Sequence, residues 1–222
     1  MTSSSPAAPI GLIGLGLMGT AFATALRGRG QSLLGFDIEP ARGAALVELG
    51  GLAADTAAEV LARGAPIILS LPSHHEVNAL LARDGGHLRA GQVIIDTTTG
   101  DPRHATQCAA ELAARGVIYL DATISGNSTQ VQKGEAVVLV GGDRDAYLAH
   151  EALLRALGGE VFHTGPSGTG AKMKLVTNLV LGLNRAVLAE GLAFAEGLAL
   201  DPRLTLAIMR RSQAYSRAMD VK

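Results

Sequence analysis

The sequence predicts an α/β fold with a doubly wound, mostly parallel sheet, followed by an all-α second domain. Short apolar runs alternate with helix-length segments as far as residue 163. Most of these runs are apolar throughout rather than at every second residue, as in strands that are buried on both faces. After them, glycine and proline gather over residues 165–170, and only helical patterns come later in the chain.

The expected elements are taken in chain order. Runs rich in Ile, Leu and Val predict strands over residues 10–13, 32–37, 66–71, 92–96, 117–121, 136–140 and 160–163. Helical patterns are expected over residues 20–27, 40–49, 76–82, 104–114 and 145–157. Beyond the glycine cluster we expect a long helix over residues 171–200 and another from 203 to about 212, started by the N-cap Asp201 and by Pro202.

The break at residues 165–170 predicts the domain organisation. We expect residues 1–9 to form a flexible tail, residues 10–165 to form the sheet domain, and residues 166–222 to begin an all-helical domain that is incomplete in this chain. The long helix is apolar nearly all round and has little helical sequence to cover it. We therefore expect a homodimer or homotetramer that associates through the helical domain.

The composition argues against several classes of partner. Net charge is −1 and aromatic residues make up 3% of the chain, so neither nucleic acid nor an anionic membrane is an expected partner. Residues 1–9 lack the features of a secretory signal. Polar residues interrupt the apolar segment 175–200, which predicts a buried helix and not a membrane span. Cys108 is the sole cysteine, so we expect an inert, partly buried thiol and a reducing, cytoplasmic compartment.

The strongest local signal is a glycine turn between the first strand and the first helix. It comes directly after an apolar strand, opens a helical pattern and precedes a strand that ends in Asp37. A dinucleotide-binding unit of the Rossmann type requires this arrangement. Its glycines permit the tight turn, let the backbone approach a pyrophosphate and let the helix pack on the strand. The motif reads Gly14-Leu15-Gly16-Leu17-Met18-Gly19.

Asp37 predicts which dinucleotide is preferred. Its carboxylate would accept hydrogen bonds from the adenosine ribose hydroxyls and repel a 2′-phosphate. This favours NAD over NADP, although Arg42 lies five residues further on and could soften the preference. The alternative interpretation of the glycines is a plain strand-to-helix turn in another kind of α/β protein.

Five ordered segments resemble motifs of the β-hydroxyacid dehydrogenase family, the group of 3-hydroxyisobutyrate and 6-phosphogluconate dehydrogenases. They are the glycine turn, Leu71-Pro72 followed by Val77, residues 96–102 (Asp-Thr-Thr-Thr-Gly-Asp-Pro), residues 121–127 (Asp-Ala-Thr-Ile-Ser-Gly-Asn) with Gly134, and residues 168–178 (Gly-Thr-Gly-Ala-Lys-Met-Lys-Leu-Val-Thr-Asn). The resemblance runs from residue 10 to about residue 222. The chain departs from the family where Thr123 replaces a proline, Asn127 a glycine and Thr177 an asparagine.

The resemblance implies an oxidoreductase that transfers a hydride between NAD, or NADP, and a small carboxylate-bearing substrate, a 3-hydroxy acid or a semialdehyde. It assigns cofactor contacts to the glycine turn, Asp37, Leu71, Pro72 and Thr99. It assigns the substrate to Ser125, Gly126, Asn127 and Asn178. Because Asn127 brings a side chain where the family has glycine, we expect it to influence which substrate fits.

The resemblance also implies that Lys174 is the general acid/base, taking the hydroxyl proton in oxidation and returning it in reduction. Lys174 and Asn178 are four residues apart on the long helix and so share a face. A lysine works well near neutral pH only if burial or another cation lowers its pKa. The alternative is an ordinary solvated lysine, and we expect Lys172 to be of that kind.

Other interpretations remain open. His74 and His75 suggest a metal site, but neighbours on an extended loop point apart and no third ligand is suitably spaced, so we expect a loop that flanks the cofactor cleft. The same fold also supports imine reduction, although imine-reducing relatives typically lack the lysine at position 174. A third possibility is a shortened protein that binds NAD without efficient turnover.

Overall fold

The computed structural model describes residues 8–220 and divides the chain into two compact units, Met1–Lys174 and Leu175–Lys222. Most of the expected N-terminal tail, residues 1–7, lies outside the described residues. The first unit contains the sheet and the helices that cover it. The second contains the greater part of the long helix and the short elements near the end of the chain.

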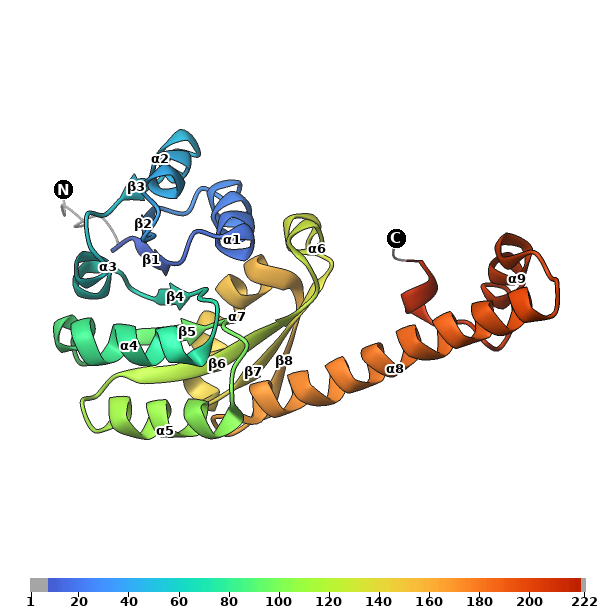
Figure 1. The fold of residues 1–222 in the computed structure, drawn as a ribbon. Coiled ribbons are helices and arrows are strands. Elements are labelled where there is room, and N and C mark those ends of the chain that lie inside the picture. The colour runs from blue at the N-terminus through green and yellow to red at the C-terminus, as the bar shows by residue number, and fades with distance from the viewer. Residues whose placement is uncertain (1–7, 221–222) are drawn as a thin grey trace. The chain divides into compact units, whose positions relative to one another are not determined.

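The first unit is built on one eight-stranded sheet of order β3-β2-β1-β4-β5-β6-β7-β8 (Figure 1). All neighbouring strands run parallel except β6 and β7, which are antiparallel. This confirms the predicted mostly parallel, doubly wound sheet, and its first six strands have the Rossmann order. The strands are β1 (Ile10–Ile13), β2 (Leu33–Phe36), β3 (Leu52–Ala53), β4 (Ile67–Leu69), β5 (Val93–Asp96), β6 (Ile118–Ser125), β7 (Ala136–Gly141) and β8 (Gly159–Gly165).

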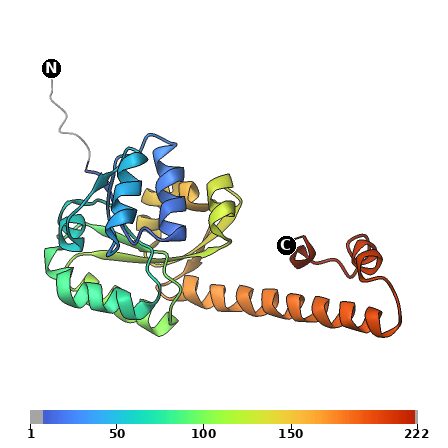
Figure 2. The same cartoon turned by 45° about the horizontal axis from the view of Figure 1, so that its top comes forward.

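Helices cover both faces of the sheet, as Figure 2 shows from a second direction. One face carries α1 (Leu17–Arg27), α2 (Pro40–Glu48), α6 (Ser128–Lys133) and α7 (Arg144–Gly158). The other carries α3 (Ala57–Arg63), α4 (His74–Asp84) and α5 (Pro102–Ala113), with the short 3₁₀ helix Gly85–His87 after α4. Helices on both faces explain why most of the strands are apolar throughout.

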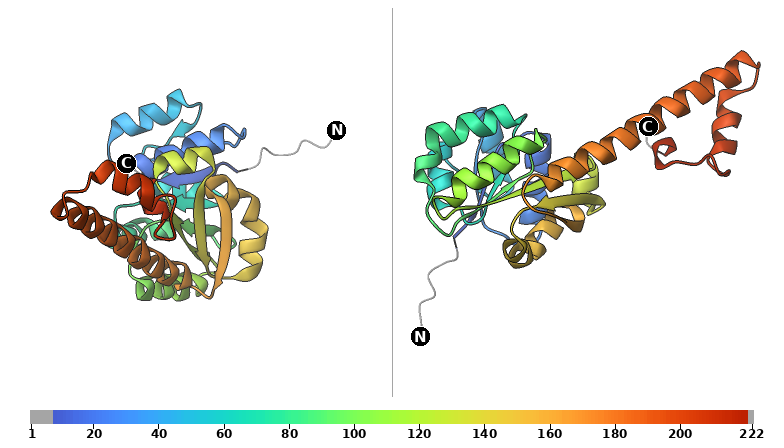
Figure 3. Two further views of the ribbon diagram at one scale, coloured as in Figure 1. Left: turned by 90° about the vertical axis from the view of Figure 1, so that its right-hand side faces the viewer. Right: turned by 90° about the horizontal axis from the view of Figure 1, so that it is seen from below.

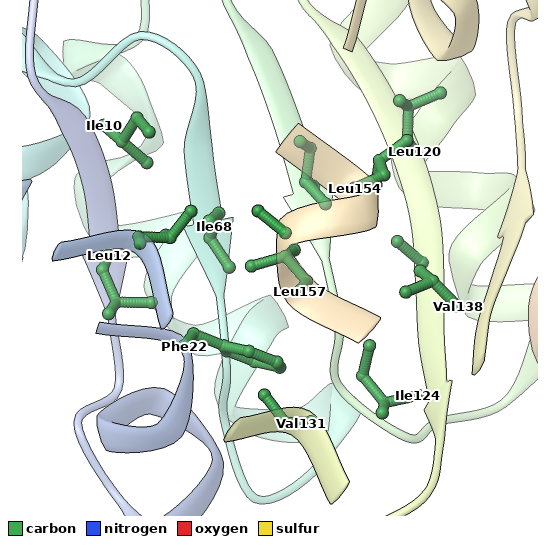
Figure 4. Close-up of a cluster of buried hydrophobic side chains, with 14 of the residues drawn as sticks. Ile10, Leu12, Phe22, Ile68, Leu120, Ile124, Val131, Val138, Leu154 and Leu157 are labelled. Atoms are coloured by element: carbon green, nitrogen blue, oxygen red, sulfur yellow. The ribbon is translucent and has the colours of Figure 1, made fainter. Parts of the chain in front are cut away.

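The core is accordingly split into two layers. In the layer of Figure 4, Phe22 of α1, Val131 of α6 and Leu157 of α7 pack with Ile68 and other strand residues. Their side chains are almost completely buried. Burial of such a side chain contributes about 1.5–3 kcal/mol, so this layer fixes α1 firmly against the sheet. The second layer lies between the sheet and α3, α4 and α5.

Local sequence determines where most of these helices begin. Side-chain oxygens accept a hydrogen bond from the first turn at the N-caps of α3, α4, α5 and α7. Such caps satisfy backbone donors that have no partner inside the helix. The capping residues are Thr56, Ser73, Asp101 and Asp143.

The long helix α8 (Thr169–Gly197) starts in the first unit and continues into the second, which also holds α9 (Pro202–Met209) and the 3₁₀ helix Arg217–Met219. Figure 3 allows α8 to be followed along its length. Its expected burial is wrong for the described chain, because Leu179 is 64% and Phe194 70% exposed. Only short elements accompany it in its unit. By length and composition alone α8 could cross a membrane, a test that core helices of water-soluble proteins also pass.

Several local predictions differ from the structure. The sequence does not predict β3, α3 or α6. The strand β3 has only two residues, and the helices α3 and α6 are short, so none of the three shows a clear periodic pattern. β6 extends to Ser125, beyond residue 121 where the predicted strand ends, so most of the motif segment 121–127 is strand. His74 and His75 do not lie in a loop but begin α4, capped by Ser73.

Candidate functional site

A cleft of about 690 Å³ lies at the carboxyl ends of β1, β2, β4 and β5. The strand order reverses at β1: the chain continues to β2 and β3 on one side of it and to β4 and β5 on the other. Open α/β sheets bind ligands at such a reversal. The structure brings eight of the sequence-predicted residues together in its lining. They are Gly14, Gly16, Leu17, Met18, Asp37, Leu71, Pro72 and Thr99.

The glycine turn leaves no room for side chains at its first and third glycines. Gly14 has a φ of +92°, and a Cβ there would lie 2.2 Å from the Ser70 carbonyl oxygen. A Cβ on Gly19 would lie 1.9 Å from the Gly14 carbonyl oxygen. At Gly16 the nearest atom to such a Cβ is Arg42 Nη1 at 3.9 Å, so the backbone there faces open space. These are the three roles that the motif predicts.

The start of α1 is suited to an anion. Its N-cap is Gly16, which provides no capping side chain, and its first turn holds no acidic residue. The N–H groups and the positive end of the helix dipole therefore remain available to a phosphate. Leu17 and Met18 of this first turn line the cleft.

Asp37 is more constrained than the sequence suggests. Its Oδ2 accepts a hydrogen bond from the Leu15 N–H at 2.6 Å, and its Oδ1 accepts one from the Glu39 N–H at 3.0 Å. Arg42 Nη1 lies 3.2 Å from both carboxylate oxygens. The carboxylate thus braces the glycine turn while it lines the cleft. The Leu15 side chain is buried and, like Gly19, is absent from the lining.

One wall of the cleft is missing from the sequence-based prediction. Glu76, Ala79, Leu80 and Arg83 of α4 all line it. Their spacing of three, four and seven residues places them on one face of a helix. That spacing, directly after the Leu71-Pro72 segment, is the signal that could have found them. Ser70 and Thr97 were missed as well, and each comes directly after the end of a strand.

The loop after β5 is held by a buried carboxylate. Asp96 accepts hydrogen bonds from the Thr98 N–H at 2.9 Å and from the Tyr119 hydroxyl at 2.6 Å. Burial raises the pKa of Asp96. The Thr97 hydroxyl donates to the Leu69 carbonyl at 2.7 Å, and the Thr98 hydroxyl accepts from the Leu71 N–H at 3.2 Å. Loop 97–99 is therefore tied to the ends of both β4 and β5.

A small cavity lies behind this loop. It is lined by Thr98 of the loop and by Gly100 just after it, by Asp121 and Thr123 of β6, and by Ala171 in the first turn of α8. Thr97 and Thr99, the neighbours of Thr98, line the large cleft. A three-residue loop thus separates the cleft from the start of α8.

Lys174 lies one turn after Ala171 in α8. Its side chain is half-buried, and burial lowers the pKa of its amine. Lys172 is exposed, as expected. Asn178 belongs to the second unit, on the same helix, and its side chain is exposed there. Lys174 therefore has the environment that an amine needs to exchange protons nearer neutral pH.

The segment after β6 is already hydrogen-bonded. Ser125 ends the strand, and Gly126 comes next with a φ of +153°. Asn127 caps α6: its Oδ1 accepts from the Gln130 N–H at 2.9 Å, and its own N–H donates to Gln130 Oε1 at 3.0 Å. In this conformation both polar groups of Asn127 expected to meet substrate are used within α6.

The two histidines and the cysteine that the sequence singled out lie on helices α4 and α5. The rings of His74 and His75 lie 4.1 Å apart at the start of α4, and residues 8–220 contain no group of three or more His, Cys, Asp or Glu arranged for a metal. Cys108 is buried on α5, 3.3 Å from His104 Nε2. Burial raises the pKa of its thiol to about 12, so it stays protonated.

Two family models match the chain. Residues 9–165 match the NAD-binding domain of 6-phosphogluconate dehydrogenase. Residues 168–222 match the NAD-binding domain of NADP-dependent 3-hydroxyisobutyrate dehydrogenase. The second match includes both α8 and α9, so the apolar helix α8 belongs to a domain that this family of dehydrogenases shares.

Curated relatives agree with these matches. The chain is 33% identical over 216 residues to the 2-(hydroxymethyl)glutarate dehydrogenase of Eubacterium barkeri, covering 96% of this chain and 72% of that protein. The NAD-dependent L-serine dehydrogenase of Pseudomonas aeruginosa gives the same figures. The human mitochondrial 3-hydroxyisobutyrate dehydrogenase is 30% identical over 96% of this chain, which spans only 64% of that relative's length.

Solved structures show the same fold. The 3-hydroxyisobutyrate dehydrogenase of Mycobacterium tuberculosis, solved with L-serine, matches with a TM-score of 0.88 and 26% identity over 95% of this chain and 72% of that one. An imine reductase variant from Myxococcus stipitatus, in complex with NAD⁺, matches with a TM-score of 0.81 and 25% identity over 93% of this chain and 72% of that one.

Proposed function

Since the chain belongs to the β-hydroxyacid dehydrogenase family, we propose that it transfers a hydride between a nicotinamide dinucleotide and a small 3-hydroxy acid or the matching semialdehyde. One observation carries the proposal. Loop 97–99 lines the cleft of the glycine turn on one side and, on the other, the small cavity reached by the first turn of α8. The dinucleotide cleft and the helix of Lys174 therefore meet at one short loop.

The names of the relatives point to one substrate class. 3-Hydroxyisobutyrate, 2-(hydroxymethyl)glutarate and L-serine are all acids with a CH₂OH group on the carbon next to the carboxylate. They differ only in the third substituent: a methyl, a carboxyethyl or an ammonium group. We propose that this chain acts on the shared part, the primary alcohol and its neighbouring carboxylate.

Lys174 is the proposed general acid/base. A nicotinamide dinucleotide held in the cleft would supply the acceptor or donor of the hydride. In oxidation the neutral Lys174 amine takes the hydroxyl proton as the C–H bond breaks, and a carbonyl and an ammonium result. In reduction the ammonium returns that proton to the alkoxide oxygen. Partial burial supports this role, because it lowers the pKa of the amine towards the working range.

The substrate carboxylate is proposed to bind at the end of β6. The Ser125 hydroxyl and the Gly126 N–H are suited to a small anion. The Asn127 N–H can join them only if the Gln130 side chain releases it. Asn178, one turn after Lys174, is proposed to hold the substrate or the amine by a hydrogen bond.

The proposed cofactor is NAD in preference to NADP. The cleft holds a carboxylate at Asp37, where a 2′-phosphate would need a cation. Arg42 could provide that cation, but its guanidinium is paired with Asp37. The glycine-turn contacts, Leu71, Pro72 and Thr99 complete the proposed cofactor site.

The helical residues 166–222 are proposed to belong to a substrate and dimerisation domain of a cytoplasmic homodimer or homotetramer. The support is the apolar surface that α8 exposes, including Leu179, Val187 and Phe194. Light scattering at micromolar concentration tests this, and a monomer would contradict it.

The function is tested with a panel of acids that share the CH₂OH–carboxylate unit, assayed with NAD and with NADP. A cyclic imine belongs in the panel, because an imine reductase has a similar structure. We expect oxidation of at least one acid and no reduction of the imine. Binding of NADH without turnover of any member would instead identify a dinucleotide-binding protein that lacks this activity.

A further inference from the structure

Asp121 is a buried carboxylate to which the sequence motifs assign no task. It lies on β6 directly beside Asp96 of β5, and it is 3% exposed. Both of its oxygens accept hydrogen bonds from the start of α8. Oδ1 accepts from the Gly168 N–H at 2.7 Å, and Oδ2 accepts from the Ala171 N–H at 2.9 Å.

These contacts replace a local N-cap. The first N–H groups of a helix lack partners within the helix. In α3 and α7 the residue just before the helix accepts one of these hydrogen bonds, and α1 has no side-chain cap. In α8 the acceptor comes from a strand 47 residues earlier in the chain. The carboxylate charge also complements the positive end of the dipole of this helix.

The packing around the clamp leaves little freedom. A Cβ on Gly170 would lie 2.5 Å from the Leu139 carbonyl oxygen and 2.8 Å from Asp121 Oδ2. The Thr123 hydroxyl donates to the Gly170 carbonyl at 3.2 Å. The first turn of α8 is therefore seated directly on β6 and β7, with one carboxylate fixing its rotation and its height.

We infer that Asp121 is a positioning residue for Lys174: its carboxylate fixes the first turn of α8 and thereby aims the amine one turn later. Lys174 lies three residues after Ala171, about one helical turn and a rise of roughly 4.5 Å. A small rotation of the clamped turn therefore displaces the amine at the end of its long side chain. The inference rests on the proposed function only in taking that amine as the proton-transfer group.

The test is Asp121→Asn. An asparagine offers one oxygen acceptor and one NH₂ donor, so the NH₂ must face either the Gly168 or the Ala171 N–H. We expect kcat to fall about tenfold or more, because small misplacements of a catalytic group are costly, while the Kd for NADH changes less than twofold. The matched control is Asp143→Asn, which alters the carboxylate cap of α7 and should leave kcat unchanged.

Two further measurements separate positioning from general loss of stability. Amide hydrogen exchange in residues 168–174 should accelerate in Asp121→Asn and not in Asp143→Asn. In a double-mutant cycle, Asp121→Asn should lower turnover little further once Lys174 is alanine, because it acts through that amine. If Asp121→Asn does not fold, Thr123→Val takes its place, with an expected fall in kcat of about two- to fivefold.

The outcomes are distinguishable. A kcat within twofold of wild type in both Asp121→Asn and Thr123→Val overturns the inference, as does a full additive loss in the double mutant. A wild-type protein that turns over no acid of the panel overturns the proposed function instead. In that case the exchange measurement still decides whether Asp121 holds the first turn: unchanged exchange at residues 168–174 overturns the clamp itself.

Discussion

The Leu15 N–H donates to Asp37 Oδ2 at 2.6 Å, so the acid at the end of β2 is joined to the glycine turn. One carboxylate therefore has two tasks: it shapes the phosphate-binding turn and it presents charge to the cleft. Arg42 lies against the same carboxylate and neutralises part of that charge.

Replacing Asp37 tests the preference for NAD. Asp37→Asn should weaken NAD binding about tenfold or more, because a charged hydrogen bond contributes roughly 1.5–3 kcal/mol, and should narrow the gap between NAD and NADP. Fluorescence titration with NADH and NADPH measures both affinities. Arg42→Ala is the control and should lower NADPH binding more than NADH binding. An unchanged ratio of the two affinities in Asp37→Asn would contradict the assignment.

Lys174→Ala should remove general acid/base catalysis and leave the dinucleotide cleft intact. We expect kcat to fall about 10²- to 10⁴-fold, with little change in the Kd for NADH. The matched control is Lys172→Ala, which removes an exposed amine two residues away and should retain wild-type turnover. Equal losses in the two variants would refute the special role of Lys174.

The lowered pKa of Lys174 predicts opposite pH profiles for the two directions of reaction. Oxidation needs the neutral amine, so its rate should rise with pH and level off above the Lys174 pKa, which burial lowers from the ordinary lysine value. Reduction needs the ammonium, so its rate should fall as pH rises through the same value. Initial rates of oxidation and of reduction, measured at pH values on both sides of the Lys174 pKa, give the two profiles. A profile with the same slope in both directions would exclude Lys174 as the titrating group.

The thiol of Cys108 should be unreactive in the folded protein. Its pKa of about 12 leaves almost no thiolate at neutral pH, and its side chain is buried. Alkylation followed by mass spectrometry should label it slowly in buffer and rapidly in denaturant. Cys108→Ala should keep turnover and cost about 1 kcal/mol of stability. Rapid labelling of the native protein would show that α5 opens readily.

Glycine substitutions separate the tight turn from an ordinary glycine. Gly19→Ala should lower the melting temperature by several degrees and weaken NADH binding, because its Cβ would overlap the Gly14 carbonyl oxygen. Gly182→Ala is the control: apart from its chain neighbours and the nearby backbone of its own helix, no atom of the described residues lies within 4 Å of its Cβ position, and alanine is the better helix former by about 1 kcal/mol. A stable Gly19→Ala variant would mean that the turn can rearrange.

The sequence predicted the sheet well because its strands are buried on both faces and bounded by glycine turns. It predicted the glycine turn for a different reason: the turn needs glycine at fixed positions of the motif. It failed at α6, where Asn127 and Gln130 cap a helix too short to show a period. It predicted the helix α4 but not that one face of α4 lines the cleft, because that depends on which helix face meets which strand ends. The task of Asp121 depends on a contact across 47 residues, which local patterns do not encode.

Strand β6 sets a condition on how this protein can vary. Asp121, Thr123 and Ser125 alternate with Ala122 and Ile124, which lie in the core layer under α1, α6 and α7. Deletion of a single residue within the strand would reverse this alternation, bringing methyl groups to the helix start and carboxylate and hydroxyl groups into the apolar layer. A one-residue deletion within β6 should therefore disturb both the seat of α8 and the core layer, whereas a single substitution disturbs only one of them.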